Sequence, residues 1–304
     1  MNLEKNSWLQ LALQIKGSVF PIILPRILFC TAFGFLISLI HYYGYSISEE
    51  IFASVITNVA YNLVLALLLV FRTNSAYDRY WEGRKIWGGI VINSLNLARK
   101  IRLAVTEIEP VDKENKAAVL RLLGAFAIAT KLHLRRSPIN SELETLVTSS
   151  QYIELKEAKN PALKITFWIG DYLKQQQLHN RLSIHELLAM NTSLDSMVEA
   201  FMGCDRILKT PIPIAYSIYL KRLLLIYCFL LPMKLVHDLT WWIAPIVALI
   251  CFILFGIEEI GNQIEDPFGT DSNDLPLDEI CITLINNLED LHSAKSVENS
   301  ITLN

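Results

Sequence analysis

The most oxygen-rich stretch of the sequence is the fifteen-residue segment IEDPFGTDSNDLPLD, which begins at Ile264 and ends at Asp278. It lies in a longer region, Glu258 to Asp290, that contains ten Asp or Glu residues and no Lys or Arg. Carboxylates grouped around turn residues are ligands for a hard cation such as calcium, although the EF-hand spacing is absent. A solvated acidic loop is the alternative interpretation, and spacing alone favours it.

No catalytic motif accompanies this segment. The sequence has no GxxxxGK[ST], GxSxG, HExxH or GxGxxG pattern. The six histidines are dispersed, and the five cysteines contain no CxxC pair, which fits neither a disulfide framework nor a zinc site. The sequence therefore does not predict an enzyme.

A second pattern is a row of large apolar residues. Leu63, Leu67 and Phe71 recur at i, i+4 and i+8, so in a helix they lie on one face. Lipid contact or helix packing is the ordinary explanation of such a row. Asn58 and Asn62 in the same segment favour another, in which the row lines a symmetry axis as a hydrophobic constriction that gates ions by dewetting.

The segment that follows, RTNSAYDRYWEGRKIWG at 72–88, alternates charged and aromatic residues. Trp, Tyr and Arg are typical of a membrane interface. Its charges also have the spacing of ion pairs within a helix. Both structural interpretations are open, and both place this segment at the end of a membrane span.

The composition requires such spans. Hydrophobic residues make up 52% of the 304 and charged residues 19%, below the usual value of roughly 25%. The mean hydropathy of +0.35 excludes a disordered chain. The formal charge of −3 gives no basic excess for nucleic acid. Four segments are long and apolar enough to cross a bilayer: Ile27–Tyr45, Ile51–Phe71, Leu223–Val236 and Leu239–Ile257.

The basic residues predict the orientation of these spans. Of the 27 Lys and Arg residues, 22 fall between Arg72 and Arg222, whereas the link Gly44–Glu50 has none. The positive-inside rule then places the middle segment and both termini in the cytoplasm. We expect a multi-pass protein of the cell (inner) membrane, in contact with membrane lipid.

The middle segment is predicted to be helical. Apolar residues recur at helical spacing in Val119–Leu134, and Ser183 and Glu186 have the spacing of a capping box. No alternating strand pattern is present, so the fold class is an all-α membrane protein. The expected divisions are 1–71 with two spans, a cytosolic helical region at 72–210, 211–258 with two more spans, and an acidic segment at 259–304.

Three stretches in this order resemble the bestrophin family of ion channels in its bacterial branch. They are RTNSAYDRYWEGRKIWG at 72–88, TPIPIAYS at 210–217 and EDPFGTDSNDLPLD at 265–278. The resemblance implies a homopentamer with one central pore, four membrane helices per protomer and a large helical cytosolic region. It implies that Leu63, Leu67 and Phe71 line a narrow neck, in agreement with the apolar row.

The resemblance also implies two further sites. A cytosolic aperture is expected at His185, with Ile184 adjacent, where many family members have an aliphatic residue. Five imidazoles at an aperture would make conductance respond to pH near about 6–7. In calcium-activated relatives the acidic segment forms a calcium clasp, whose matching side chains are Gln263, Asp266, Asp271 and Asp274. The acidic run is interrupted here by Ser272 and Asn273, so no cofactor is required and calcium is an optional ligand.

The predicted function is passive conduction of small monovalent ions through a pentamer. Chloride or another anion is slightly favoured over a monovalent cation such as sodium. Ten acidic residues after the fourth span would favour cations if they faced the pore. A secondary transporter, which usually has inverted repeats, and a non-conducting membrane scaffold are the alternatives.

Overall fold

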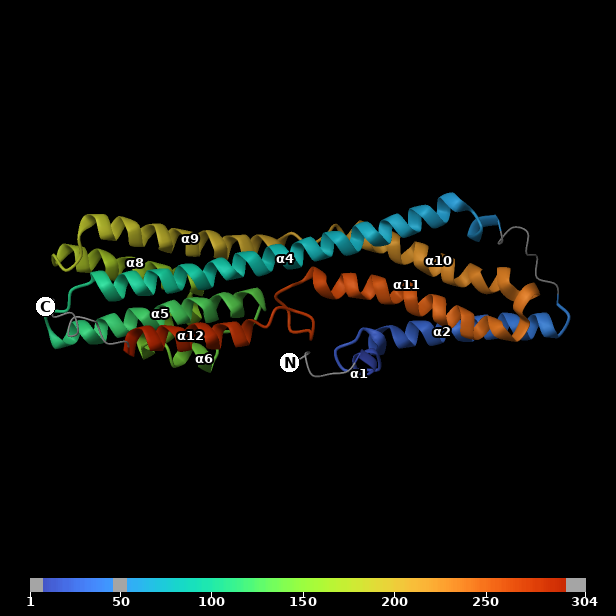
Figure 1. Ribbon diagram of the computed structural model, residues 1–304, viewed down its shortest axis with the longest axis horizontal. Helices are drawn as coiled ribbons and strands as arrows, with labels where there is room; N and C mark the ends of the chain where they lie inside the picture. Colours follow the sequence, from blue (N-terminus) through green and yellow to red (C-terminus); the bar gives the residue numbers. More distant parts are fainter. Residues whose placement is uncertain (1–7, 46–53, 294–304) are drawn as a thin grey trace, which may run out of the picture. The chain divides into compact units, whose positions relative to one another are not determined.

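The computed structural model describes residues 8–45 and 54–293, and these form helices with no β-strand (Figure 1). The all-α prediction is confirmed. The helices are α1 (Trp8–Ala12), α2 (Phe20–Tyr42), α4 (Val59–Ala104), α5 (Pro110–Leu134), α6 (Ser141–Glu144), α7 (Ser149–Glu157), α8 (Pro161–Leu178), α9 (Ile184–Lys209), α10 (Ile214–Leu239), the 3₁₀ turn η2 (Thr240–Trp242), α11 (Ile243–Glu265) and α12 (Leu277–Ser293).

The chain divides into two compact units. Unit 1 comprises residues 1–80, 211–267 and 271–273, and unit 2 comprises 81–210, 268–270 and 274–304. The helix α4 contributes its first part to unit 1 and its second part to unit 2.

Unit 1 is built around the three helices α2, α10 and α11, which pack against one another and against the start of α4. Its core is apolar and includes Ile23, Leu69, Leu224 and Val247. Gly34 of α2 faces this contact, since a Cβ there would meet Ile243 at 3.5 Å and Val247 at 3.6 Å, which is ordinary van der Waals contact. The helices that carry the predicted spans therefore form one bundle.

The helix ends differ from the predicted span ends. Helix α2 begins at Phe20 instead of Ile27, with Pro21 in its first turn, where proline is tolerated, and it continues through Pro25 and Arg26. Helix α4 does not end at Phe71 but continues to Ala104, because no proline interrupts 72–104. The predicted start of the second span, Ile51, lies outside the described residues, as does most of the Gly44–Glu50 link.

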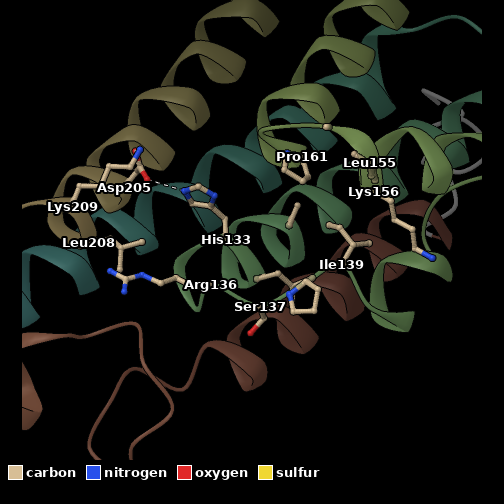
Figure 2. Close-up of a pocket in the computed structure, with 14 residues that line it drawn as sticks. His133, Arg136, Ser137, Ile139, Leu155, Lys156, Pro161, Asp205, Leu208 and Lys209 are labelled. Carbon is tan, nitrogen blue, oxygen red and sulfur yellow. Dashed lines mark hydrogen bonds and ion pairs between the residues drawn. The ribbon is translucent and has the colours of Figure 1, made fainter.

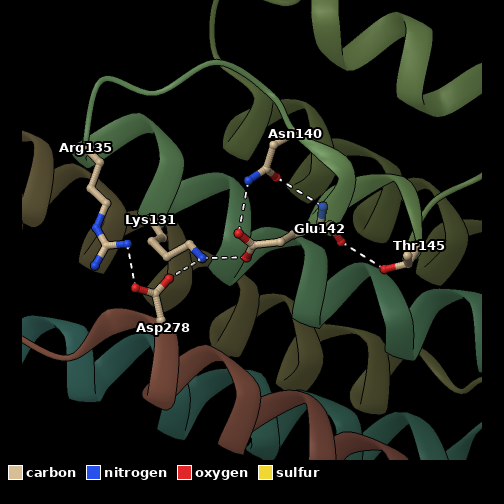
Figure 3. Close-up of polar contacts among 6 residues, drawn as sticks. All are labelled: Lys131, Arg135, Asn140, Glu142, Thr145 and Asp278. Atoms are coloured by element: carbon tan, nitrogen blue, oxygen red, sulfur yellow. Dashed lines mark hydrogen bonds and ion pairs between the residues drawn. The ribbon is translucent and has the colours of Figure 1, made fainter. Parts of the chain in front are cut away.

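Unit 2 is a bundle in which α5 is the central helix, packed against α8, α9 and α12. The predicted capping box at the start of α9 is confirmed, since Ser183 Oγ accepts from the Glu186 backbone amide and Glu186 accepts from the Ser183 amide. Figure 3 shows one polar junction of this unit, where Lys131 of α5 donates to Glu142 and to Asp278 of α12.

Among the described residues, five helices are long and apolar enough to cross a membrane: α2, α4, α5, α10 and α11. The extra one, relative to the four predicted spans, is α5. Its most apolar window is 78% buried inside the protein, whereas the windows of the other four are 22–39% buried. Helix α5 therefore buries its apolar surface by packing within unit 2. The apolar surfaces of α2, α4, α10 and α11 stay largely exposed in the single chain and require another apolar environment.

Candidate functional site

The predicted neck residues form an exposed apolar row on α4. Leu63, Leu67 and Phe71 are 56%, 44% and 58% exposed in a single chain, whereas Leu65 and Leu69 on the opposite side are 4% and 5% exposed. The described residues of unit 1 therefore leave about half of each side chain in the row uncovered. It is available to lipid, to neighbouring copies of the chain or to a shared axis.

Two tyrosine hydroxyls fix the rotation of α4 against α10. Tyr61 donates to the carbonyl of Leu223 at 2.9 Å, and Tyr216 donates to the carbonyl of Leu68 at 2.8 Å. Both bonds lie on the side of α4 that faces the bundle. They fix the rotation of α4 about its own axis. The exposure of the Leu63, Leu67 and Phe71 row therefore follows from how α4 packs against α10.

The next residue after the row, Arg72, is buried and anchored. Its Nη2 donates to Asn262 Oδ1 at 3.0 Å and to Glu265 Oε2, both on α11. The other carboxylate oxygen of Glu265 accepts from the backbone amide of Ile212 at 2.8 Å. Glu265 thus joins α4, the end of α11 and the TPIPIAYS segment at one point. The helix ion pairs proposed from local spacing do not include this contact, which spans more than 190 positions.

A second polar group lies on α11. Arg26 Nη1 pairs with Glu259 at 2.9 Å and with Glu258 at 3.5 Å, and Lys221 lies 3.7 Å from Glu258. Arg26 lies within α2, and its side chain is 43% exposed while it pairs with these two acidic residues. The acidic residues that would favour cations are therefore in part paired: Glu258, Glu259 and Glu265 in unit 1, and Asp278 in unit 2.

The candidate calcium ligands are divided between the two units. Gln263, Asp266 and Asp271 belong to unit 1, and Asp274 belongs to unit 2. In unit 1 the amide nitrogen of Asn273 donates to Gln263 Oε1 at 2.7 Å and to the Gly17 carbonyl at 3.5 Å. An amide donor therefore already satisfies the oxygen that the sequence comparison offered as a cation ligand.

The candidate aperture residues lie in the first turn of α9. His185 and Ile184 are both exposed on the single chain. Ser183 caps the helix immediately before them, so the two side chains project from a fixed helix start. The structure places them in unit 2, whereas the neck residues are in unit 1.

Sequence reasoning missed a cavity of about 730 Å³ in unit 2 (Figure 2). Asp205 on its wall binds His133 Nε2 at 2.8 Å and Lys209 Nζ at 2.6 Å. Burial alone would raise the pKa of Asp205, but the hydrogen bonds from Lys209 and His133 hold it below its usual range. No spacing signal connects residues 133 and 205, so only the folded bundle reveals this group.

Comparison with known proteins identifies the family. The sequence model of "Bacterial/Fungal Bestrophin protein" matches residues 1–290. The chain belongs to the bestrophin family. This confirms the resemblance found in the three sequence motifs.

Among the bestrophin's relatives is "Voltage-dependent anion channel-forming protein alr2987" of Nostoc sp. (strain PCC 7120), 52% identical over 96% of this chain and 94% of that protein. A Synechocystis protein with the same descriptive name is 48% identical over 93% of this chain and 91% of its own length. The crystal structure of a bacterial bestrophin homologue from Klebsiella pneumoniae matches with a TM-score of 0.80 and 26% identity, covering 90% of this chain and all of that one. These names describe channels and not enzymes, as the sequence predicted.

Proposed function

We propose that this bestrophin is a homopentameric channel in the cell (inner) membrane that conducts small monovalent anions. The observation that carries the proposal is the row of Leu63, Leu67 and Phe71, whose large apolar side chains are 44–58% exposed in the single chain. Five such rows around one axis form a hydrophobic neck, in which the ease of wetting controls ion passage. The names of the relatives as anion channel-forming proteins support the same function.

The pairing of acidic residues supports anion over cation conduction. Arg26 and Lys221 lie against Glu258 and Glu259, and Arg72 lies against Glu265. Each pair removes a net negative charge from the segment that would otherwise concentrate cations. Selectivity then depends on the neck and on the aperture at Ile184 and His185.

The orientation follows the positive-inside rule, with both termini and unit 2 in the cytoplasm. Calcium is not required in this proposal, because Asn273 supplies an N–H donor where a calcium clasp would need an open oxygen. The side chains that could still bind the ion are Gln263, Asp266, Asp271 and Asp274. Currents should therefore be equal in chelator-buffered and calcium-containing solutions.

The test is a recording from purified protein in planar bilayers under a chloride gradient. Wild type should show an anion reversal potential, and the triple variant Leu63→Ala, Leu67→Ala, Phe71→Ala should conduct more, because small side chains leave the neck easier to wet. The matched control is Leu225→Ala, Leu249→Ala, Phe252→Ala, which removes the same side chains from exposed positions on α10 and α11. Equal currents in the neck variant and wild type would remove the row from the pore.

A further inference from the structure

Three of the five cysteines meet inside unit 1. Cys30 of α2, Cys228 of α10 and Cys251 of α11 are free thiols with exposed fractions of 1%, 0% and 0%. Their sulfur atoms all lie within 4.8 Å of one another. Within residues 8–45 and 54–293 this is the single group of three His, Cys, Asp or Glu side chains with such spacing.

The sequence conceals this group because its members are 23 to 221 positions apart. Packing brings them together. Gly34, one turn after Cys30, lies where α2 faces both other helices, since a Cβ there would be 3.6 Å from Pro232 of α10 and 3.6 Å from Val247 of α11. Cys228 and Cys251 each lie about one turn from those contacts.

The spacing suits a bound metal ion. Metal–thiolate bonds of about 2.3 Å put the three sulfurs of a trigonal site about 4 Å apart. The observed upper limit of 4.8 Å requires only small side-chain adjustments, with no movement of a helix. Three sulfur donors on three helices also define the plane of a trigonal metal site, whereas two thiols would not.

The donor set determines the kind of ion. All three ligands are sulfur, and the surrounding core is apolar, with Ile27, Leu224 and Val247 among its members. Hard cations such as calcium and magnesium need oxygen ligands, whereas thiolates select soft ions. Each cysteine that binds as a thiolate releases one proton, so a monovalent ion offsets the charge of one thiolate and a divalent ion the charge of two in the low-dielectric interior.

We propose that Cys30, Cys228 and Cys251 form an intramembrane site for a soft, thiophilic cation bound by three sulfur atoms. The bound ion connects α2, α10 and α11 and stabilises the bundle against which α4 packs. This site is separate from the neck row and does not depend on the ion that the channel conducts. Monovalent Cu(I) and divalent Cd(II) are the two probes that distinguish the charge of the preferred ion.

The test is metal binding to the reduced, full-length protein in detergent. Cu(I) is added in competition with a Cu(I) chelator, and Cd(II) binding is followed by thiolate-to-metal charge-transfer absorption. At least one of the two ions should bind at one per chain. Cys251→Ala should weaken that binding by at least about 100-fold, the upper range for loss of an outer-shell partner, because it removes a direct ligand.

The matched control is Cys281→Ala, which removes another buried, free cysteine from α12 of unit 2. Its affinity should equal that of wild type. Cys251→Ser provides a second variant of nearly unchanged size if the alanine variant does not fold. X-ray absorption of loaded wild type should show three sulfurs around the metal.

Binding that is undiminished in Cys251→Ala or Cys251→Ser would overturn the proposal. So would fewer than three sulfurs in the absorption spectrum, or a wild-type protein that binds neither ion. Channel currents are not needed for any of these measurements. Failure of the site therefore leaves the proposed channel function untouched, and failure of the channel leaves the site testable.

Discussion

Replacing Glu265 by glutamine tests how α4 is held at the end of the apolar row. The two carboxylate oxygens accept from two donors, Arg72 Nη2 and the Ile212 backbone amide. Glutamine keeps the shape but offers one oxygen and one NH₂ group. One of the two donors must then face another donor, and the Arg72 guanidinium loses its charged partner.

The structure bounds the cost of this change. Arg72 is only 2% exposed, and breaking a fully buried ion pair costs about 3–5 kcal/mol. Glu265 is 18% exposed and Asn262 still accepts from Arg72, so we expect the lower end, about 3 kcal/mol. For an unfolding unit of 150–250 residues this lowers the melting temperature by roughly 6–12 °C.

Thermal unfolding of purified protein in detergent measures the loss, with Glu279→Gln as the control because Glu279 is an exposed acid on α12. Glu265→Gln should also cost less in the Arg72→Met background, because the charge partner is already gone. A melting temperature equal to that of Glu279→Gln would refute the argument. If Glu265→Gln lowered the stability equally in the wild-type and Arg72→Met backgrounds, the loss would not come from the ion pair with Arg72.

Three further changes have defined outcomes. The hydrogen bond from Lys131 holds the pKa of Asp278 below its usual range, so its stabilisation is complete above about pH 4 and is lost as the pH falls through the folded-state pKa. Asp278→Asn should therefore cost about 1 kcal/mol at pH 7, because Asp278 is 55% exposed, and less below pH 4 in urea or thermal unfolding. Gly170→Ala should stabilise α8 by about 0.5–1 kcal/mol, since the added Cβ meets Leu194 at an ordinary 3.5 Å. His185→Ala should change the anion current, because the proposed aperture places this exposed side chain beside the ion path.

Each of these has a matched comparison in the chain. For the glycine, Gly203→Ala should gain nothing, because its Cβ would lie 3.1 Å from Ile86. For the aperture, Ile184→Ala should change the current less, since Ile184 is adjacent to the residue expected at the aperture. A Glu279→Gln protein that lost as much stability as Asp278→Asn at pH 7 would contradict the assigned Lys131 contact.

The regular parts of the fold could be predicted from local pattern. The start of α9 could be predicted because Ser183 and Glu186, three positions apart, form a capping box. The continuation of α4 past Phe71 could not be predicted in the same way. The charged residues after Phe71 are typical of the end of a membrane span, but none of them ends the helix. The ion pairs of Arg26 could not be predicted either, because its partners, Glu258 and Glu259, lie more than 230 positions away in the sequence.

The candidate sites follow the same division. The Leu63, Leu67 and Phe71 row was visible because its members share one helix and one period. The Cys30, Cys228 and Cys251 group was not visible, since it exists only where three helices cross. Local periodicity predicts a face of a helix, whereas a cluster formed by several helices requires their packing.

The burial of α5 has a consequence for biosynthesis. This helix leaves the ribosome before α8, α9 and α12, which later cover it, and its most apolar window has the hydropathy of a membrane span. Insertion of α5 would add a fifth crossing and invert every segment after it. Arg121, near the middle of α5, opposes that error, since a charge at a membrane centre costs about 2.5–3.5 kcal/mol. A single cation would therefore favour the proposed topology of α10 and α11 before α5 is covered by its neighbours.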